Sequence, residues 1–405
     1  MSNQKIIFIG FLSLIVFVIS LFAGNSFAQR FLTENVSVTP TIQPSSTPIA
    51  KLVDTESVCP LNGKKFTQAD QMRWEQLRPV AVMIENHPES RPQSGLDAAD
   101  VVYEAVAEGG ITRFMALYLC EPVPQFVGPV RSARTYFLDW VLEYNSLYAH
   151  VGGANTPGPA DAISQITQFG IKSINEIPLG AKLSLQAGYQ RIEDRNPGVS
   201  MEHTMYLEIA KLREYAQDKF NWGVVTDNAR WDSTFVKWQY ANSKNEKIIS
   251  EAKPASYIAY EFWEDTLGGF NVRWDYEADS NTYTRAMNDR PHIDKNTNKP
   301  ITASNVIVLF QEEERANDGY LNNLHLLYQT IGKGEGYLMR DGYAAPIVWE
   351  KSGRNARTKF KDAQGQELSL SPGKIWISVV PKYNQKLVQL PGQASNKPAP
   401  SDTEE

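Results

Sequence analysis

Two arginines flank the predicted start of a helix, in the segment Gly128-Pro129-Val130-Arg131-Ser132-Ala133-Arg134. Apolar residues at helical spacing follow, and Ser132 is the expected N-cap. A helix N-terminus carries roughly half a positive charge, so cations in its first turn cost about 0.3–1 kcal/mol each. A negative group should therefore lie beside Arg131 and Arg134. It is either a ligand phosphate or carboxylate, or a set of the protein's own acids.

Internal acids are available for this role. They are Asp97, Asp100, Glu104 and Glu108. The last two belong to a predicted hairpin, with strands over 101–107 and 111–119 joined by Gly109-Gly110; a helix over 101–107 is the alternative.

In the regular form of this hairpin, Glu108 opposes Ile111 and Val106 opposes Arg113. Glu104 and Glu108 then lie diagonally from Arg113 on one face of the ladder. The two glutamates would then form ion pairs with Arg113 across the two strands.

Three histidines, His87, His150 and His203, lie at the ends of predicted elements. No two of them share ligand spacing on one helix, and an H-E-x-x-H motif is absent. The pattern therefore favours hydrogen-bonding or anion-binding histidines over a metal site.

We expect the ligand to be an anionic small molecule or an envelope glycopolymer, bound without a cofactor. The candidate residues are Glu85, Asn86, Arg91, Asp100, Glu104, Glu108, Arg113, Arg131, Ser132, Arg134 and His150. One alternative is a phosphotransferase in which the arginines stabilise a transferred phosphoryl group and Asp97 or Asp100 holds Mg²⁺. Another is a scaffold whose arginine–glutamate network is purely structural. The sequence does not decide whether the protein is an enzyme.

Alternating strands and helices position these residues. A buried strand over 79–84 ends at Glu85, and ligands gather at such carboxyl ends in open sheets. Further elements are predicted as a helix over 133–144, a strand over 147–151, and helices over 159–169 and 206–220. This alternation predicts a layered α/β domain over 58–245.

Beyond this region the pattern changes to strands of period two. They are expected at 256–262, 269–276, 305–310 and 374–380. The fold class is thus α/β (α+β), with a smaller β-rich domain over 246–388.

The amino-terminal segment predicts export. Lys5 precedes an apolar stretch from Ile6 to Ala23, and Ser26 and Ala28 suit signal peptidase. A helix over the stretch would be roughly 27 Å long, so 1–28 is either a cleaved signal peptide or an uncleaved membrane anchor. The location is then extracytoplasmic, secreted or anchored. No cysteine lies near the end of the stretch, which excludes lipoprotein processing there.

Cys59 and Cys120 are the two cysteines of the chain. In an oxidising compartment we expect them to form a disulfide, worth about 4 kcal/mol in the chain-entropy model, rather than two buried thiols. Pro, Ser and Thr mark 29–57 as an extended spacer, and 389–405 has the composition of a disordered tail.

The charge composition of the chain limits the classes of molecule that it could bind. The chain has 405 residues, with 40 Lys and Arg against 46 Asp and Glu, and a net charge of −6. Such a balance provides no electrostatic footprint for nucleic acid. Envelope components, including other envelope proteins, remain as partners.

Several longer motifs resemble the YerB-like family. They are Glu85-Asn86, Arg91-Pro92-Gln93-Ser94-Gly95-Leu96, Ala99-Asp100-Val101-Val102-Tyr103-Glu104, Glu108-Gly109-Gly110-Ile111-Thr112-Arg113, Gly128-Pro129-Val130-Arg131-Ser132-Ala133-Arg134 and His150-Val151-Gly152-Gly153. Asp294, Asn305-Val306-Ile307-Val308 and Trp349-Glu350-Lys351 resemble its carboxyl-terminal domain. The resemblance spans about 78–382 and implies a two-domain bacterial envelope protein of unknown function, commonly a lipoprotein. This chain departs from that pattern by lacking the lipid-modified cysteine.

The order of some of these motifs is also similar to the pyrophosphate pocket of LytR-CpsA-Psr glycopolymer phosphotransferases. This likeness is one of pattern only. It is the origin of the phosphotransferase alternative.

Overall fold

The computed structural model describes residues 56–123, 125–242, 251–264 and 269–392. The predicted signal or anchor over 1–28, nearly all of the spacer, and the tail beyond residue 392 lie outside the described residues. Within the described ranges, no helix combines the length and the apolar character needed to cross a membrane.

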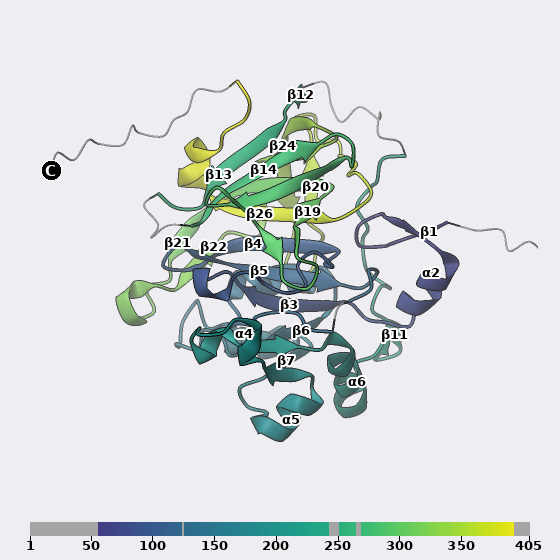
Figure 1. The fold of residues 1–405 in the computed structure, drawn as a ribbon, viewed down its shortest axis with the longest axis vertical. Helices are drawn as coiled ribbons and strands as arrows, with labels where there is room; N and C mark the ends of the chain where they lie inside the picture. Colours follow the sequence, from purple (N-terminus) through teal and green to yellow (C-terminus); the bar gives the residue numbers. More distant parts are fainter. Residues whose placement is uncertain (1–55, 124, 243–250, 265–268, 393–405) are drawn as a thin grey trace, which may run out of the picture. The chain divides into compact units, whose positions relative to one another are not determined.

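One mixed sheet of 11 strands runs through both predicted domains (Figure 1). Its strands in spatial order are β12 (Lys253–Pro254), β24 (Tyr343–Lys351), β23 (Gly332–Arg340), β20 (Asn305–Gln311), β26 (Ile375–Pro381), β4 (Val101–Glu108), β5 (Ile111–Tyr118), β3 (Val80–Glu85), β6 (Leu147–His150) and β7 (Ser173–Asn175), and β25 (Lys359–Lys361) pairs with β24. The two segments meet where β26 pairs with β4 in parallel. The carboxyl-terminal strands therefore continue the amino-terminal sheet.

A second, antiparallel sheet covers one face of this junction. It contains β13 (Tyr257–Glu261), β14 (Asn271–Glu277), β15 (Thr282–Met287), β16 (Arg290–Pro291) and β19 (Thr302–Ala303). Burial alternates along β13, as its period-two pattern predicts, and also along β15, which lies outside the predicted strands. Trp274 of β14 packs edge-on against Trp376 of β26, with ring centroids 5.3 Å apart.

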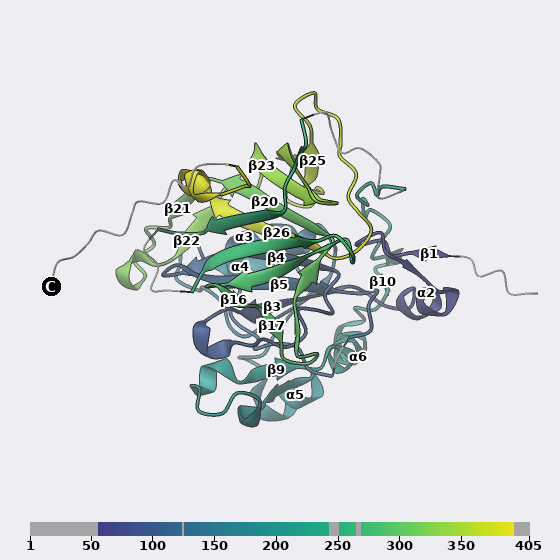
Figure 2. The ribbon, with the colours of Figure 1, turned by 45° about the horizontal axis from the view of Figure 1, so that its top comes forward.

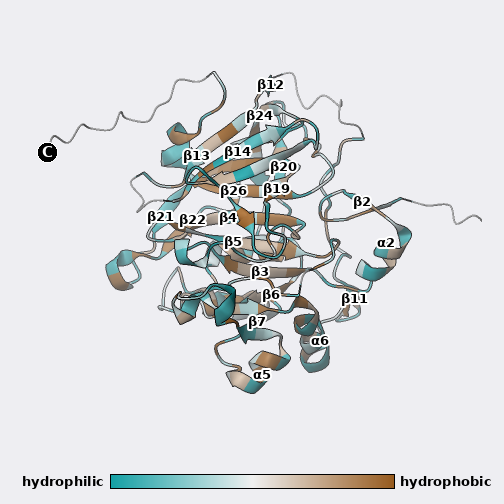
Figure 3. Ribbon diagram, viewed as in Figure 1, coloured by the Kyte–Doolittle hydropathy of each residue, from teal (hydrophilic) through white to brown (hydrophobic). Residues whose placement is uncertain are grey.

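Helix α3 (Thr135–Leu142) covers the opposite face of β4, where Trp140 stacks on Tyr103 with ring centroids 5.1 Å apart. Figure 2 shows α3 beside β4 from a tilted direction. The described helices are α2 (Gln68–Trp74), α3 (Thr135–Leu142), α4 (Ala162–Gln168), α5 (Gly180–Gln186) and α6 (Ile209–Phe220). Apolar residues gather in the central strands (Figure 3), and β4, β20 and β26 are buried along nearly their whole length.

Short hairpins and 3-10 turns complete the described structure. The paired strands are β1 (Ser57–Val58) with β2 (Lys65–Phe66), β8 (Tyr189–Arg191) with β9 (Met205–Leu207), β10 (Val225–Thr226) with β11 (Ala229–Arg230), β17 (Ile293–Asp294) with β18 (Lys299–Pro300), and β21 (Glu313–Arg315) with β22 (Leu326–Tyr328). The 3-10 turns are η1 (Pro88–Ser90), η2 (Glu193–Arg195), η3 (Met201–His203), η4 (Leu321–Asn323) and η5 (Lys382–Leu387).

The layered α/β fold class is confirmed, as is the hairpin of β4 and β5. The assignment of Ser132 as a helix N-cap is wrong. Helix α3 begins at Thr135, and its N-cap is Arg134, whose side chain makes no capping hydrogen bond. Ser132 instead belongs to the extended segment that leads into the helix.

The predicted register of the hairpin is wrong by one residue over most of its length. Glu108 opposes Ile111 as expected, but a bulge between Val106 and Glu108 places Ala105, not Val106, opposite Arg113. Because successive side chains alternate between faces, this extra residue moves Glu104 to the face opposite Arg113 and keeps Glu108 beside it. The two glutamates thus take different roles.

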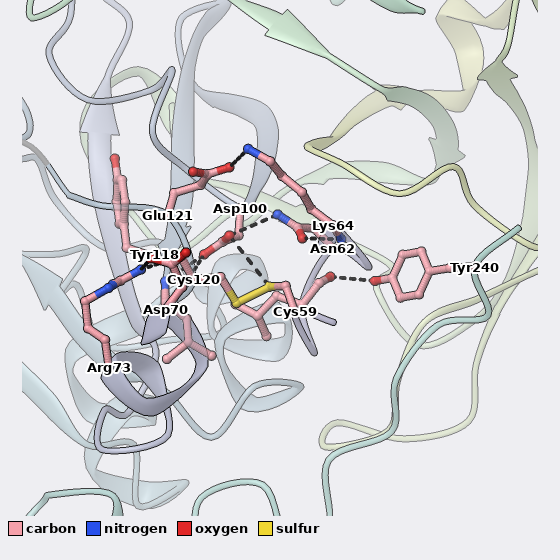
Figure 4. Close-up of a disulfide and its surroundings, with 12 residues drawn as sticks. Cys59, Asn62, Lys64, Asp70, Arg73, Asp100, Tyr118, Cys120, Glu121 and Tyr240 are labelled. Carbon is pink, nitrogen blue, oxygen red and sulfur yellow. Dashed lines mark hydrogen bonds and ion pairs between the residues drawn. A yellow bond between two sulfur atoms is a disulfide. The ribbon is translucent and has the colours of Figure 1, made fainter. Parts of the chain in front are cut away.

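The disulfide between Cys59 and Cys120 is confirmed (Figure 4). It lies beside the buried carboxylate of Asp100, whose Oδ2 accepts hydrogen bonds from the backbone N–H groups of Leu119 and Cys120, at 2.7 and 2.9 Å. Asn62 donates to Oδ1 at 2.9 Å. Burial nevertheless raises the pKa of Asp100 to about 6.

A buried ion pair joins the two sheets. Arg285 of β15 lies 2.9 Å from Glu104 of β4, and neither side chain is exposed. Thr112 and Trp376 donate to the same carboxylate at 2.9 and 3.2 Å. The Arg285 Nε–H donates to Nδ1 of His292, so that imidazole is neutral with its proton on Nε2.

Replacing Arg285 by Met should cost about 3–5 kcal/mol of unfolding free energy, because Glu104 would stay buried without a counter-charge. The matched control is Arg273→Met in the neighbouring strand β14, whose partner Asp275 is 43% exposed. That change should cost no more than about 1 kcal/mol. Urea denaturation measures the unfolding free energy of both variants. Equal losses would contradict the burial of Glu104 between the two sheets.

The raised pKa of Asp100 predicts a pH dependence. The folded state holds this proton more tightly than the unfolded state, so its contribution to stability is present below pH 4 and is lost as the pH rises through 6. The unfolding free energy of the wild type minus that of Asp100→Asn should therefore fall by about 2 kcal/mol between pH 4 and pH 7. Denaturant titrations across this range measure the difference. A difference that does not change with pH would show that burial leaves this carboxyl unperturbed.

Candidate functional site

Antiparallel pairing brings several of the predicted charged residues to one edge of the sheet. Glu85 ends β3 and Glu108 ends β4, while Arg113 lies near the start of β5. Glu85 and Arg113 are paired directly in the ladder. Arg131 and Arg134 reach the same edge from the segment before α3. We call Glu85, Glu108, Arg113, Arg131 and Arg134 the arginine cluster.

Ion pairs connect the members of the arginine cluster. Nε of Arg131 lies 2.9 Å from Oε1 of Glu85. Glu108 pairs with Arg134 and lies 3.8 Å from Arg113. Arg113 also donates to the backbone carbonyl of Ser132 at 3.1 Å. Glu85 and Glu108 therefore supply part of the negative charge that the sequence pattern predicts beside the arginines.

The internal acids do not balance the charge of the cluster. Three guanidinium groups face two carboxylates, which leaves one positive charge in excess. The side chains of Arg113 and Arg134 are 7% and 6% exposed. Burial lowers the pKa of Arg113, and the positive charge of Arg131 lowers it further. An excess cation at this depth is costly unless a negative group joins it.

Three buried polar atoms in and beside the arginine cluster have no hydrogen-bond partner among the described residues. They are Nε of Arg131, which lies 2.9 Å from Glu85 without hydrogen-bond geometry, Nε of Arg134, and the hydroxyl of Tyr148 in β6. The side chains of Arg134 and Tyr148 interact electrostatically, and burial raises the pKa of Tyr148, so its hydroxyl stays protonated and can donate. The edge of the cluster reaches solvent, because Arg131 and Glu108 are 23% and 25% exposed.

His150 lies on the neighbouring strand β6, but its ring nitrogens are already engaged. Nδ1 is 2.7 Å from the carbonyl of Gly152, and Nε2 is 2.6 Å from the hydroxyl of Ser173. Burial lowers the pKa of His150 to about 4, so the ring is neutral at physiological pH. We therefore leave His150 out of the arginine cluster. It shapes the Gly152 turn instead.

Other predicted site residues belong to the seam between the two sheets. Nε of Arg91 donates to the side chain of Asn86 at 3.1 Å, and its guanidinium lies over the ring of Phe270. Asn86 in turn donates to Thr112 at 2.7 Å, and Thr112 donates to Glu104. Arg91, Asn86 and Glu104 are thus brought together, but away from the arginine cluster.

The acids considered for Mg²⁺ lie at the other end of β4. Asp100 immediately precedes this eight-residue strand and Glu108 ends it, a separation of roughly 25 Å. Asp97 is paired with Lys374 at 3.0 Å. Neither carboxylate is placed beside the arginines that would stabilise a phosphoryl group.

Sequence reasoning missed a contact between Glu85 and His203, which are 118 positions apart. Nδ1 of His203 lies 2.7 Å from Oε2 of Glu85. His203 also stacks on His87, with ring centroids 4.8 Å apart. Two of the three singled-out histidines therefore meet, although no helical spacing links them. Tyr148 was missed because an aromatic residue in an apolar strand is indistinguishable from core.

Comparisons with known proteins find two matching domain families, a relative of similar sequence and a solved structure of similar fold. Residues 66–224 match the N-terminal domain, and residues 261–377 the C-terminal domain, of a protein of unknown function (DUF3048). The chain is 29% identical over 328 residues to "Putative lipoprotein YerB" of Bacillus subtilis (strain 168). The aligned residues make up 80% of this chain and 86% of that protein. The crystal structure of YerB from Bacillus subtilis matches with a TM-score of 0.66 at 25% identity, covering 83% of this chain and 99% of that chain.

Proposed function

This chain belongs to the YerB-type family with paired DUF3048 domains, and from that premise we propose that it is an exported envelope protein whose arginine cluster binds an anionic or glycopolymer-type ligand. The observation that carries the proposal is that three guanidinium groups, two of them buried and that of Arg131 at the exposed edge, face only two carboxylates. A phosphate or carboxylate group of the ligand would restore neutrality.

Two kinds of donor are available to such a group. The N–H at Nε of Arg134 and the hydroxyl of Tyr148 are buried, and the protein provides no acceptor for either among the described residues. Hydrogen bonds from charged donors to phosphate oxygens are among the strongest in proteins. Arg131, at the exposed edge of the cluster, would meet the ligand first.

Export is supported by the sequence of the first 28 residues and by the name of the Bacillus subtilis relative, which describes a lipoprotein. The segment lacks the cysteine that lipid attachment needs. We propose that the apolar stretch itself holds the protein at the outer side of the cytoplasmic membrane or directs its secretion.

The test is calorimetric titration with inorganic pyrophosphate and with poly(glycerol phosphate), in buffer that contains EDTA. The wild type should bind both. Tyr148→Phe removes one hydroxyl with little change in shape, and Arg134→Gln removes one charge. Each should weaken binding by roughly tenfold or more, because each removes a hydrogen bond to a charged group. The control Arg230→Gln, at an exposed arginine paired with Asp232, should bind like the wild type.

Failure of the wild type to bind either probe would contradict the proposal. Equal affinity of Tyr148→Phe, Arg134→Gln and the wild type would contradict it as well. The arginine cluster would then be a structural ion-pair network, the scaffold alternative. Thermal unfolding of each variant checks that a loss of binding does not arise from a loss of fold.

A further inference from the structure

A second group of polar side chains lies on the far side of Glu85. It contains His87, at the entry to η1, Glu89 within η1, and Glu202 and His203 within η3. One ligand atom from each of His87, Glu89 and His203 lies within 4.8 Å of the others. We call these four residues the histidine pair site. The arginine cluster does not use them for its own charge balance.

Glu85 fixes the protonation of His203. Because the carboxylate of Glu85 can only accept, the Nδ1 that faces it at 2.7 Å carries the ring proton. In the neutral ring, the lone pair is then on Nε2. This nitrogen points toward Oε2 of Glu89 at 3.4 Å and Oε1 of Glu202 at 3.6 Å. Both distances are long for a hydrogen bond, and leave room for adjustment around a shared ion.

Charge also favours a cation at this position. Among the described residues, the ion pairs of Glu89 and Glu202 involve His203 alone. The two carboxylates are 52% and 60% exposed, whereas His203 is 3% exposed. A buried imidazole thus faces two exposed carboxylates at an opening to solvent, and the second imidazole, from His87, is stacked beside it with an interplanar angle of 9°.

We propose that the histidine pair site binds a divalent transition metal ion of the zinc type, with His87, His203 and Glu89 as ligands and Glu202 within reach as a fourth. Two imidazole nitrogens select such an ion over Mg²⁺ and Ca²⁺, which prefer oxygen ligands. Glu85 is the positioning residue, since metal-binding histidines commonly donate their other ring N–H to a carboxylate.

To bind an ion, the ligand atoms, now within 4.8 Å of one another, must draw together and the ring of His87 must turn out of its parallel stack on His203, because the lone pairs of two parallel rings do not converge on one point. Bonds of about 2.0–2.1 Å in a tetrahedral site place ligand atoms roughly 3.3 Å apart. Glu89 and Glu202 are exposed and lie in short turns, so their carboxylates can move inward without disturbing the sheet. The site goes beyond the proposed anion-binding function and does not require it.

The test is titration of the tag-free full-length protein with Zn²⁺, followed by calorimetry and by the rise in melting temperature. We expect one ion per chain. His87→Ala and Glu89→Gln, both in surface turns, should each weaken binding by at least tenfold. Glu193→Gln, at an exposed glutamate of η2, is the matched control and should bind like the wild type.

Two further readouts separate ligands from the positioning residue. Co²⁺ should give the visible absorption of a four- or five-coordinate ion in the wild type and lose it in His87→Ala. Glu85→Gln should retain that spectrum but bind Zn²⁺ 10–100-fold more weakly. Zn²⁺ binding that His87→Ala and Glu89→Gln leave unchanged would overturn the proposal. So would the absence of Zn²⁺ binding, or Mg²⁺ binding of equal strength.

Discussion

The placement of three guanidinium groups, two of them buried, beside two carboxylates is the constraint on which this site depends. Charges of one sign repel strongly where water is excluded, so the arginine cluster is stable only with every available acid in place. The bulge in β4 makes this possible. It places Glu108 on the same face of the sheet as Arg113 and Arg134, whereas Glu104 faces the second sheet. The strand β4 thus contributes one carboxylate to the arginine cluster and another to the contact between the two sheets.

The site is also a product of the way the two family domains are joined. β26 from the carboxyl-terminal segment pairs with β4, and Arg285 from the second sheet neutralises Glu104. With Glu104 engaged there, it is unavailable to the arginine cluster. The excess positive charge on one face of β4 and the pairing of Glu104 with Arg285 on the other both follow from the way this one strand distributes its two glutamates. The carboxyl-terminal segment thus takes part in the electrostatics of a site that it does not line.

Much of the fold follows from local pattern. The apolar run before Glu85, the Gly109-Gly110 turn and the helical spacing after Arg134 predict β3, the β4–β5 hairpin and α3. The bulge was not predictable, because no residue of Val106-Ala107-Glu108 marks an extra position, and a one-residue shift reverses which face each side chain occupies. Likewise His203 and Glu85 meet only through the return of the chain at β9. Charge and spacing located the arginines, but not their partners.

The most direct test of the charge imbalance is a crystal structure of the protein soaked with selenate, with anomalous diffraction recorded at the selenium edge. The account predicts a peak within hydrogen-bonding distance of Nε of Arg134 and the hydroxyl of Tyr148, and loss of that peak in crystals of Tyr148→Phe. A cluster without a peak, in which Nε of Arg134 donates to a carboxylate of the protein, would show that the buried charges are already balanced and would contradict the account.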